Sequence, residues 1–304
     1  MRLTEDSILD RVRRRVAIPR GSPVIAGIGD DCAIFRPAGA KEDLLFTTDL
    51  LVEGVHFDRA THPPAAVGHK ALARGLSDIA AMGGKPNFCL LSLAVPGSAD
   101  AAWITRFYDG LLRLAGRAGL ILAGGDLARA ERCACDIVVA GSVPRGSALR
   151  RSGARPGDAI YVSGRLGGSA LGLATGKGPA WKRHLLPEPR LELGRFLRGR
   201  LRATAAMDLS DGLSLDLRRL CVASKVSAEI EAPPIFPRAT LDQALNGGED
   251  YELLFTVRAG TRVPPRFEKL PLTRIGTILR GSPGRILFSG RPLAPLGYDH
   301  FKRS

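Results

Sequence analysis

The chain has 304 residues, a hydrophobic content of 45% and a formal net charge of +14. Its length predicts two domains or one large domain, and its hydrophobic content is sufficient for a buried core. No apolar run approaches the roughly 18–20 residues that a transmembrane helix needs. The opening residues 1–6 are polar and lack the apolar segment of a secretory signal. A membrane-spanning protein is therefore excluded, and we expect a cytoplasmic one.

A dense group of basic side chains between residues 182 and 202 accounts for part of the positive charge. Nucleic-acid binding is one explanation for such a group. However, Glu188 and Glu192 interrupt it, and aromatic residues that could stack on bases are limited to Trp181 and Phe196. A solvated helix face is the preferred interpretation, and a basic nucleic-acid-binding protein remains an alternative of a different class.

The five cysteines are odd in number and scattered, which argues against a disulfide framework. Cys133 and Cys135 would share one face of a strand and could supply half of a zinc site. No second pair of Cys or His residues at a suitable spacing accompanies them. Burial within a strand is therefore the simpler prediction for both.

Apolar spacing predicts the elements of the first half. Ile8, Val12 and Val16 indicate a first helix, which Pro19 ends. Two longer helices follow, at 65–82 and about 99–118, and Ser98 is the expected N-cap of the second. Strands are expected at 24–28, 32–35, 44–46, 87–95, 120–123 and 137–143.

A break is predicted at residues 144–157, where proline and glycine cluster. It divides the chain into residues 1–146 and 147–304, and strands mix with helices in both parts. The fold class is therefore α/β (α+β) with two domains. In the second part we expect helices at 167–175, 191–201 and 212–224, and strands at 159–163, 228–231, 253–257, 274–278 and 285–288.

Short acidic clusters set among glycine and hydroxyl residues are the most informative feature of the chain. Mg²⁺ prefers oxygen ligands and commonly joins protein carboxylates to substrate phosphates. The clusters therefore predict an enzyme that handles a phosphorylated nucleotide through several Mg²⁺ ions. They are Asp30-Asp31, Thr47-Thr48-Asp49, Ser77-Asp78, Gly124-Gly125-Asp126 and Asp208-Leu209-Ser210-Asp211.

Two of these clusters allow a finer argument. Asp30 and Asp31 are adjacent, so in extended backbone they point to opposite faces, and one could bind metal while the other bonds to backbone. Asp78 lies between Leu76 and Ile79 on an apolar helix face, where a carboxylate is costly unless paired or metal-bound. A P-loop is excluded because the chain lacks its Gly-x4-Gly-Lys-Ser/Thr pattern.

Taken in order, the motifs resemble those of the thiamine-monophosphate kinase family. This family belongs to a superfamily with aminoimidazole ribonucleotide synthetase, selenophosphate synthetase and a hydrogenase-maturation enzyme. The resemblance covers nearly the whole chain, and the combination is more specific than any single motif. It rests on residues 27–33, 47–57, 71–83, 124–126, 207–213, 247–253 and 297–301.

The resemblance implies an aminoimidazole ribonucleotide synthetase-like fold, with an N-terminal sheet that dimerises and a C-terminal α/β domain that closes the active-site cleft. It implies a homodimer that uses ATP and several Mg²⁺ ions to convert thiamine monophosphate into thiamine diphosphate, with release of ADP. We assign no general base, because the attacking phosphate oxygen is already anionic.

The family's site residues transfer to matching positions of this sequence. The resemblance implies a metal shell, a nucleotide site and a substrate site, in which Glu249 pairs with the cationic ring or bonds to the aminopyrimidine. The metal shell would be Asp30, Thr47, Thr48, Asp49, Asp78, Asp126, Asp208 and Asp211; the ATP contacts Tyr108, Gly125, Asp126, Arg151 and Ser210; and the substrate contacts His56, Glu249 and Tyr298.

Two members of the superfamily are disfavoured by cysteine positions. Selenophosphate synthetase would carry a reactive Cys before the first aspartate motif, and here no Cys precedes Cys32. The hydrogenase-maturation enzyme uses a C-terminal Cys, whereas this chain ends Phe301-Lys302-Arg303-Ser304. An enzyme like aminoimidazole ribonucleotide synthetase remains the alternative, although the motif at 247–253 favours the kinase.

Overall fold

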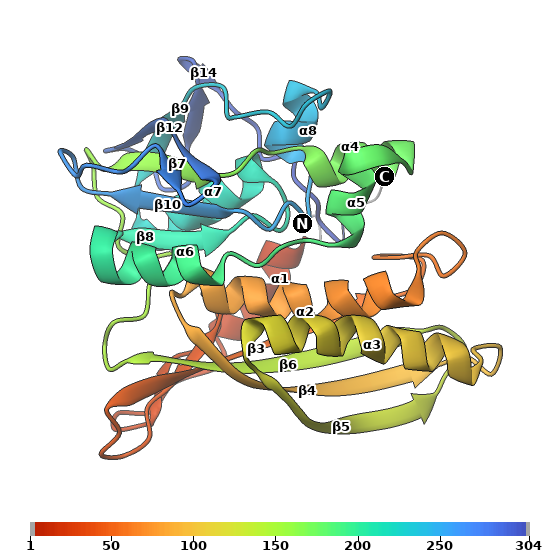
Figure 1. Cartoon of the computed structure of the whole chain (residues 1–304). Helices are drawn as coiled ribbons and strands as arrows, with labels where there is room; N and C mark the ends of the chain where they lie inside the picture. Colours follow the sequence, from red (N-terminus) through yellow and green to blue (C-terminus); the bar gives the residue numbers. More distant parts are fainter. Residues whose placement is uncertain (1–3, 302–304) are drawn as a thin grey trace.

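Two α/β halves are stacked on each other in the computed structural model, which describes residues 4–301 (Figure 1). Each half is built on one sheet, and the predicted two-part mixed architecture is observed. The first sheet has the order β1 (Val24–Ala26), β2 (Ala33–Phe35), β3 (Glu42–Val52), β6 (Ala134–Pro144), β4 (Lys85–Val95) and β5 (Ile121–Arg129). The second has the order β14 (Arg291–Pro292), β13 (Ile286–Phe288), β9 (Ser227–Ile230), β12 (Leu270–Leu279), β7 (Ala159–Ser163), β10 (Leu253–Val257) and β8 (Ala205–Asp208), and β11 (Arg266–Phe267) pairs with β12.

The helices divide between the two halves in the same way. The first half contains α1 (Glu5–Arg13), α2 (Pro64–Ala81) and α3 (Ala101–Ala118). The second contains α4 (Gly168–Thr175), α5 (Gly178–Leu185), α6 (Leu191–Phe196), α7 (Leu213–Ser224) and α8 (Leu241–Asn246), and a π-helical turn at Leu197–Leu201 continues α6.

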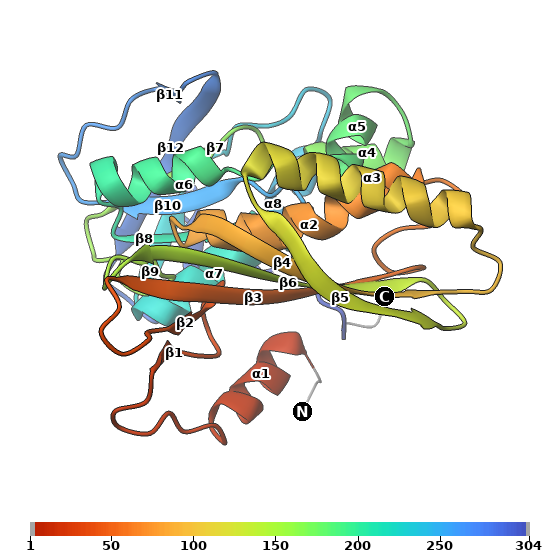
Figure 2. The same cartoon turned by 60° about the horizontal axis from the view of Figure 1, so that its bottom comes forward.

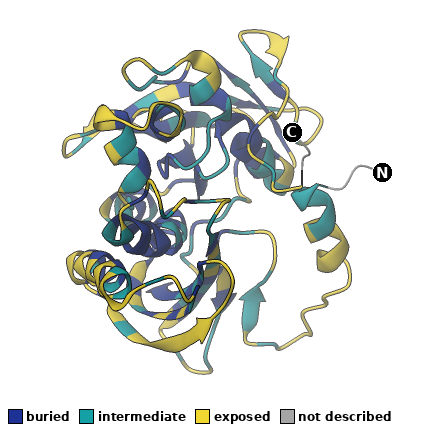
Figure 3. Cartoon of the chain, turned by 90° about the vertical axis from the view of Figure 1, so that its right-hand side faces the viewer, coloured by how far each residue is buried: buried dark blue, intermediate teal, exposed yellow. Residues whose placement is uncertain are grey.

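Helix α2 is the element on which the two halves meet (Figure 1). Its residues are mostly small and apolar, and nearly the whole helix is buried because the first sheet covers one side and the second half the other. Ala80 and Ala81 belong to the same apolar cluster as Leu253 and Phe255 of β10. Figure 3 shows buried residues through the middle of the molecule where the halves join. Polar side chains of α2 consequently lie at the domain boundary.

Strand β3 has two chemically different faces. Leu45, Thr47 and Leu51 are buried, whereas Thr48 and Leu50 are exposed. This alternation follows from the two-residue period of a strand. Consecutive residues of the Thr-Thr-Asp motif therefore point to opposite sides of the sheet.

Helix α1 lies apart from both sheets, below β1 and β2 in Figure 2, and none of its residues is buried. Thr4 caps it through the backbone N–H of Ser7. Asp6 ties it to the second half through Arg218 and Arg219 of α7, at 3.0 and 3.2 Å. Charge pairing rather than apolar burial holds this helix in place.

Several element boundaries differ from the sequence-based expectations. Asp100, not Ser98, caps α3, because its side chain accepts from the Trp103 N–H at 2.7 Å. Strand β5 runs on through Asp126 instead of ending before it. The expected 191–201 helix changes to π-helical geometry after Phe196. Helices α5 and α8 were not predicted.

All five cysteines are free and buried in the described part of the chain, including Cys133 and Cys135 beside and within β6, as predicted. Within residues 4–301, no helix has both the length and the apolar character needed to cross a bilayer.

Helices α2 and α3 pack at a distance that only glycine allows. A Cβ at Gly110 would lie 1.8 Å from the Ala65 carbonyl oxygen, and one at Gly68 would lie 1.9 Å from that of Phe107. Both clashes are with backbone, so no side-chain movement can relieve them. The position of α2, and of its polar residues, depends on this contact.

We expect Gly110→Ala to destabilise the protein by about 1–3 kcal/mol, as overpacking does in a well-packed core. Gly116→Ala is the matched control, since it lies in the same helix with nothing within 4 Å of its Cβ. It should be neutral or stabilise by about 0.5–1 kcal/mol. Urea unfolding of both variants measures the difference, and equal stabilities would contradict the close-packing argument.

Candidate active site

A cavity of about 270 Å³ opens between the two halves. It is lined from both, by the end of β3, by α2, by the end of β8 and by the loop that precedes β10. Eight of the predicted site residues share it: Asp49, His56, Asp78, Asp208, Ser210, Asp211, Glu249 and Tyr298.

Three carboxylates meet beside this cavity, and two of them, Asp78 and Asp208, line it. Asp31, Asp78 and Asp208 each offer an oxygen, and the three oxygens lie within 4.8 Å of one another. Asp31 precedes β2, Asp78 lies in the last turn of α2, and Asp208 ends β8. The group therefore forms only when the two halves are docked.

Like charges at this distance and depth are unfavourable. Burial, with the neighbouring carboxylates Asp49, Asp208 and Asp31, raises the pKa of Asp78 well above its ordinary value. Burial and the charge of Asp31 likewise raise the pKa of Asp208. A cation between the three would reverse this effect by stabilising the ionised forms.

An unsatisfied atom supports such a cation site. Asp31 Oδ2 is buried and has no hydrogen-bond partner among the described residues. A buried acceptor without a partner is uncommon and calls for an explanation. Three carboxylate oxygens with one acceptor unpaired are the kind of ligand set that Mg²⁺ prefers. The residues present therefore fit a hard divalent cation.

Neighbouring groups orient the three carboxylates. The Thr47 hydroxyl donates to Asp78, and the Ser77 hydroxyl donates to Asp208 Oδ2 at 2.7 Å. The Arg151 guanidinium donates to Asp31 Oδ1 at 2.6 Å. Each carboxylate thus has one oxygen fixed by the protein.

Asp30 and Asp31 diverge as the sequence argument anticipated. Asp30 accepts a backbone hydrogen bond from the Arg151 N–H at 2.9 Å, whereas Asp31 joins the acidic group. Burial and the charge of Asp31 raise the pKa of Asp30 to about 6. The sequence argument left open which of the two binds metal, and the resemblance assigned Asp30 to the metal shell, whereas Asp31 is the one that joins the acidic group.

Asp211 lies at the cavity wall with Ser210, before α7. It pairs with Arg219, which also contacts Asp216 at 3.2 Å and Asp6 at 3.2 Å. Burial and the charge of Asp211 raise the pKa of Asp216 to about 7. Arg219 and Asp216 were not predicted, and the i,i+3 spacing of this pair on α7 was the available signal.

Thr48 and Asp126 lie on the other face of the first sheet. Thr48 is exposed and donates to Asp136 at 2.6 Å. Asp136 and Asp126 both pair with Ser92, so all three side chains share that outer face. The structure therefore does not bring Thr48 and Asp126 together with the carboxylates of the cavity.

Besides Asp126, the two other predicted nucleotide contacts from the first half, Tyr108 and Gly125, also lie outside the cavity. Tyr108 packs on α3 against Phe107, with ring centroids 5.6 Å apart. Gly125 has a φ of +153°, and a Cβ there would lie 1.8 Å from the Leu91 carbonyl oxygen. Close strand pairing is sufficient to explain this glycine.

The predicted substrate residues line the same cavity as the carboxylates. His56, Glu249 and Tyr298 line it, and Glu249 pairs with the buried Lys70 at 2.7 Å. Burial lowers the pKa of His56 to about 4, so the ring is neutral near pH 7. Lys70 was missed from sequence because its partner is 179 positions away.

Glu249 is held by a strained and firmly anchored loop. Glu249 and Tyr251 have φ values of +65° and +49°, in the region that non-glycine residues seldom adopt. Asp250 accepts from the backbone N–H groups of Gly167 and Ser169. Such strain persists only where the surroundings enforce it.

The arginine-rich stretch supplies further anchors for this loop. Arg183 and Arg190 both bind the fully buried Glu252, and Arg190 makes two bonds at 2.9 and 2.6 Å. Arg198 donates to the Gly83 carbonyl at 2.8 Å. Part of the basic stretch is thus internal, and the solvated helix face expected from sequence explains only the remainder.

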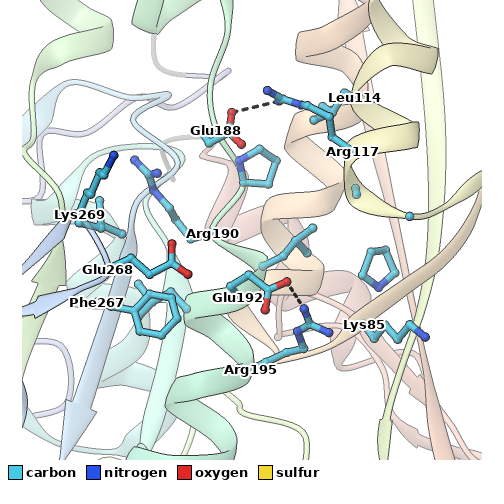
Figure 4. Close-up of a pocket in the computed structure, with 17 residues that line it drawn as sticks. Lys85, Leu114, Arg117, Glu188, Arg190, Glu192, Arg195, Phe267, Glu268 and Lys269 are labelled. Carbon is cyan, nitrogen blue, oxygen red and sulfur yellow. Dashed lines mark hydrogen bonds and ion pairs between the residues drawn. The ribbon is translucent and has the colours of Figure 1, made fainter.

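A second cavity, of about 540 Å³, is shown in Figure 4. It lies among α3, α6 and the β11–β12 hairpin, and it shares no lining residue with the first. Its charges are largely paired, as in Arg117–Glu188 at 3.1 Å and Arg195–Glu192. It holds none of the predicted site residues.

The acidic group yields a prediction on pH. Because burial raises the pKa of Asp78 and Asp208, a bound cation must displace protons at low pH. Mg²⁺ should therefore raise the melting temperature of the protein more at pH 8 than at pH 6. Saturation at about 100 times the dissociation constant corresponds to about 2.7 kcal/mol.

Asp78→Asn should lose most of this Mg²⁺ effect. Asp43→Asn is the matched control, because Asp43 is also a buried carboxylate of the first half but pairs with Arg36 at 2.6 Å. It should lower the melting temperature and keep the Mg²⁺ effect. An equal Mg²⁺ shift at both pH values, or in Asp78→Asn, would contradict the site.

Comparisons with known proteins identify the family of this chain. Residues 29–143 match the family described as AIR synthase related protein, N-terminal domain. The chain is 39% identical to the thiamine-monophosphate kinase of Escherichia coli O157:H7, over 98% of each chain. It is 35% identical to that of Bacillus subtilis strain 168, over 92% of this chain and 95% of the relative.

Solved structures give the same result. A structure described as AaThiL complexed with AMPPCP and TMP has a TM-score of 0.85, 32% identity and 99% coverage of both chains. The hydrogenase-maturation protein HypE in complex with ATP has a TM-score of 0.68 at 16% identity, over 88% of each chain, and so shares the fold alone. With near-complete relatives well above 30% identity, this chain belongs to the thiamine-monophosphate kinase family.

Proposed function

We propose that this protein transfers the γ-phosphoryl group of ATP to the phosphate of thiamine monophosphate, which gives thiamine diphosphate and ADP. The observation that carries the proposal is one interdomain cavity lined both by carboxylates and by His56, Glu249 and Tyr298. The carboxylates suit cation-bound phosphates, and His56, Glu249 and Tyr298 suit a cationic, hydrogen-bonding heterocycle. Full-length relatives named thiamine-monophosphate kinase support the assignment.

The group of carboxylates is suited to phosphoryl transfer. This reaction depends mainly on positioning and on neutralising the negative charge of the phosphates. Asp31, Asp78 and Asp208 would hold Mg²⁺, with Asp49 and Asp211 beside them at the cavity wall. Bound Mg²⁺ supplies charge neutralisation and a template for the phosphate oxygens. Asp30, Thr47, Thr48 and Asp126 remain the further members of the proposed metal shell.

The chain's own residues perform the remaining tasks. Thr47 and Ser77 orient the carboxylates by donating to Asp78 and Asp208. Arg151 partly offsets the charge of Asp31 and, with Ser210, is the proposed contact for ATP phosphates. Tyr108 and Gly125 are proposed to contact the nucleotide. No general base is needed, because the acceptor phosphate oxygen is already anionic near neutral pH.

The two halves of the chain are proposed to have different tasks. Residues 1–146 are proposed to bind ATP and Mg²⁺ and to dimerise, and residues 147–304 to close the cleft. The five free cysteines are consistent with a reducing, cytoplasmic location. The nucleic-acid alternative is weakened by arginines that serve as internal anchors for Glu252. The aminoimidazole ribonucleotide synthetase alternative lacks support from the curated relatives reported above.

The direct test is formation of thiamine diphosphate from ATP, Mg²⁺ and thiamine monophosphate, detected by chromatography. Product should be absent with EDTA and with unphosphorylated thiamine. Asp78→Asn should fold normally and lose turnover by at least about a hundredfold, the scale on which loss of one preorganised charge-stabilising group acts. A wild-type protein that binds ATP but forms no thiamine diphosphate would refute the proposal.

We also propose a homodimer through the outer face of the first sheet. Helices α2 and α3 cover one face, and over β4 and β5 the other face carries no helix among residues 4–301 (Figures 1 and 2). Leu50 of β3, Leu90 of β4 and Ile121 of β5 are 54%, 38% and 71% exposed. Thr48 and Asp126 lie on this same face. Dimerisation would bury both the apolar residues and these two polar ones.

Leu90→Asp should convert the dimer to a monomer, because it would bury a charge at the centre of the interface. Leu112→Asp is the matched control, as Leu112 is 49% exposed on α3 away from that face. Light scattering coupled to size-exclusion chromatography gives the mass. A monomeric wild-type protein, or a dimeric Leu90→Asp variant, would rule out this interface.

A further inference from the structure

Lys70 is a fully buried cation at the boundary between the two halves. It lies in α2, and its side chain is 1% exposed. Its Nζ is 2.7 Å from Glu249 Oε2, 3.4 Å from the His56 carbonyl oxygen and 3.4 Å from His184 Nε2. One ammonium group thus contacts both His56 and Glu249, which come from opposite halves of the chain.

A purely structural role explains this lysine poorly. Burial lowers the pKa of Lys70, and Glu249 only partly offsets that effect. Replacing a buried ion pair with apolar side chains of similar size is often neutral or stabilising. The surrounding α2 residues Val67, Ala71 and Ala73 show that apolar side chains are accommodated here. The buried charge therefore points to a task at the adjacent cavity.

His56 presents an unused hydrogen-bond donor beside that cavity. Its Nδ1 accepts from the Val52 backbone N–H at 3.0 Å. In the neutral ring the proton is consequently on Nε2. Nε2 is buried and has no hydrogen-bond partner in the described part of the chain. An unpaired buried donor is unfavourable, and a ligand acceptor would remove that cost.

Glu249 presents the complementary acceptor. Lys70 and His184 both approach Oε2, at 2.7 and 3.4 Å, which leaves Oε1 for a ligand. Although burial opposes ionisation, the charge of Lys70 lowers the pKa of Glu249 and keeps it a carboxylate. His56 and Glu249 line the same cavity. The pair therefore offers one N–H donor and one carboxylate acceptor to the same ligand.

We propose that Lys70 is a positioning residue that fixes His56 and Glu249 together, so that they recognise the aminopyrimidine edge of the substrate. Such an edge carries a ring nitrogen that accepts and an amino group that donates. His56 Nε2–H serves the ring nitrogen, and Glu249 Oε1 serves the amino group. This inference rests on the proposed function for the identity of the substrate. Lys70 would thereby allow the protein to distinguish ligands that differ at this edge, because His56 and Glu249 must both be held in place to do so.

The test compares two ligands by calorimetry. One is thiamine monophosphate, and the other is its analogue in which the pyrimidine amino group is replaced by a hydroxyl. In the wild-type protein the analogue should bind at least about tenfold more weakly, since it leaves buried polar groups imperfectly paired. In Lys70→Met this ratio should fall toward one, while the affinity for an ATP analogue stays largely unchanged.

Two further variants separate positioning from general stability. His69→Phe is the matched control, because His69 is the neighbouring buried residue of α2 and bonds the Pro187 carbonyl oxygen at 2.8 Å, outside the cavity. It should lower stability and keep the discrimination ratio. The double variant Lys70→Met/Glu249→Gln removes the uncompensated buried charge. It should recover stability relative to Lys70→Met without recovering the ratio.

The outcomes are distinct from those that test the proposed function. A wild-type protein that discriminates between the ligands but makes no thiamine diphosphate would refute the reaction and retain the recognition role. Wild-type discrimination that persists in Lys70→Met, or that is lost equally in His69→Phe, would overturn the positioning role. A wild-type protein that binds both ligands equally would overturn it as well.

Discussion

The mutual repulsion of three enclosed carboxylates is the constraint on which this structure depends. Asp31, Asp78 and Asp208 come from three separate elements and bring an oxygen each within 4.8 Å. Without a cation this arrangement disfavours ionisation, as the raised pKa values of Asp78 and Asp208 indicate. The fold maintains this arrangement through α2, because its close contact with α3 at Gly68 and Gly110 prevents the helix from moving Asp78 away from the other two carboxylates. The folded protein thus retains an unfavourable charge repulsion at a site that a divalent cation would complete.

The charges around the loop that carries Glu249 are instead paired. Lys70 pairs with Glu249, and Glu252 pairs with Arg183 and Arg190. These pairs hold the loop before β10 in a conformation that its backbone would not adopt alone. The three carboxylates thus repel one another, whereas Glu249 has a cationic partner in Lys70. This contrast suits the carboxylates to cation and phosphate binding, and Glu249 to recognition of the organic part of the substrate.

The sequence predicted the features that depend on local chemistry. Asp78 within an apolar helix face indicated a carboxylate with a special partner, and the structure places it in the acidic group. The end of α3 at residue 118 was also predicted. The glycine that follows, Gly119, adopts a left-handed conformation with φ +70°. Strand β3 was underestimated as residues 44–46, because Thr47, Thr48 and Asp49, which alternate between its two faces, break the apolar run.

Features that arise from tertiary contacts could not be read from the sequence. Lys70 meets Glu249 across 179 positions, and Arg151 meets Asp31 across 120. The choice between Asp30 and Asp31 depended on which carboxylate faces Asp208, which only the docking of the two halves determines. Thr48 and Asp126 lie on the outer face because strand alternation puts them there. Within the described residues, Thr48 and Asp126 therefore lie apart from Asp31, Asp78 and Asp208.

The most direct test of the central claim is a crystal structure with Mn²⁺ in place of Mg²⁺, together with a non-hydrolysable ATP analogue, recorded for anomalous scattering. This account predicts an anomalous peak between Asp31, Asp78 and Asp208, with Asp31 Oδ2 as one ligand. A bound nucleotide whose Mn²⁺ ions contact none of these three carboxylates would contradict it.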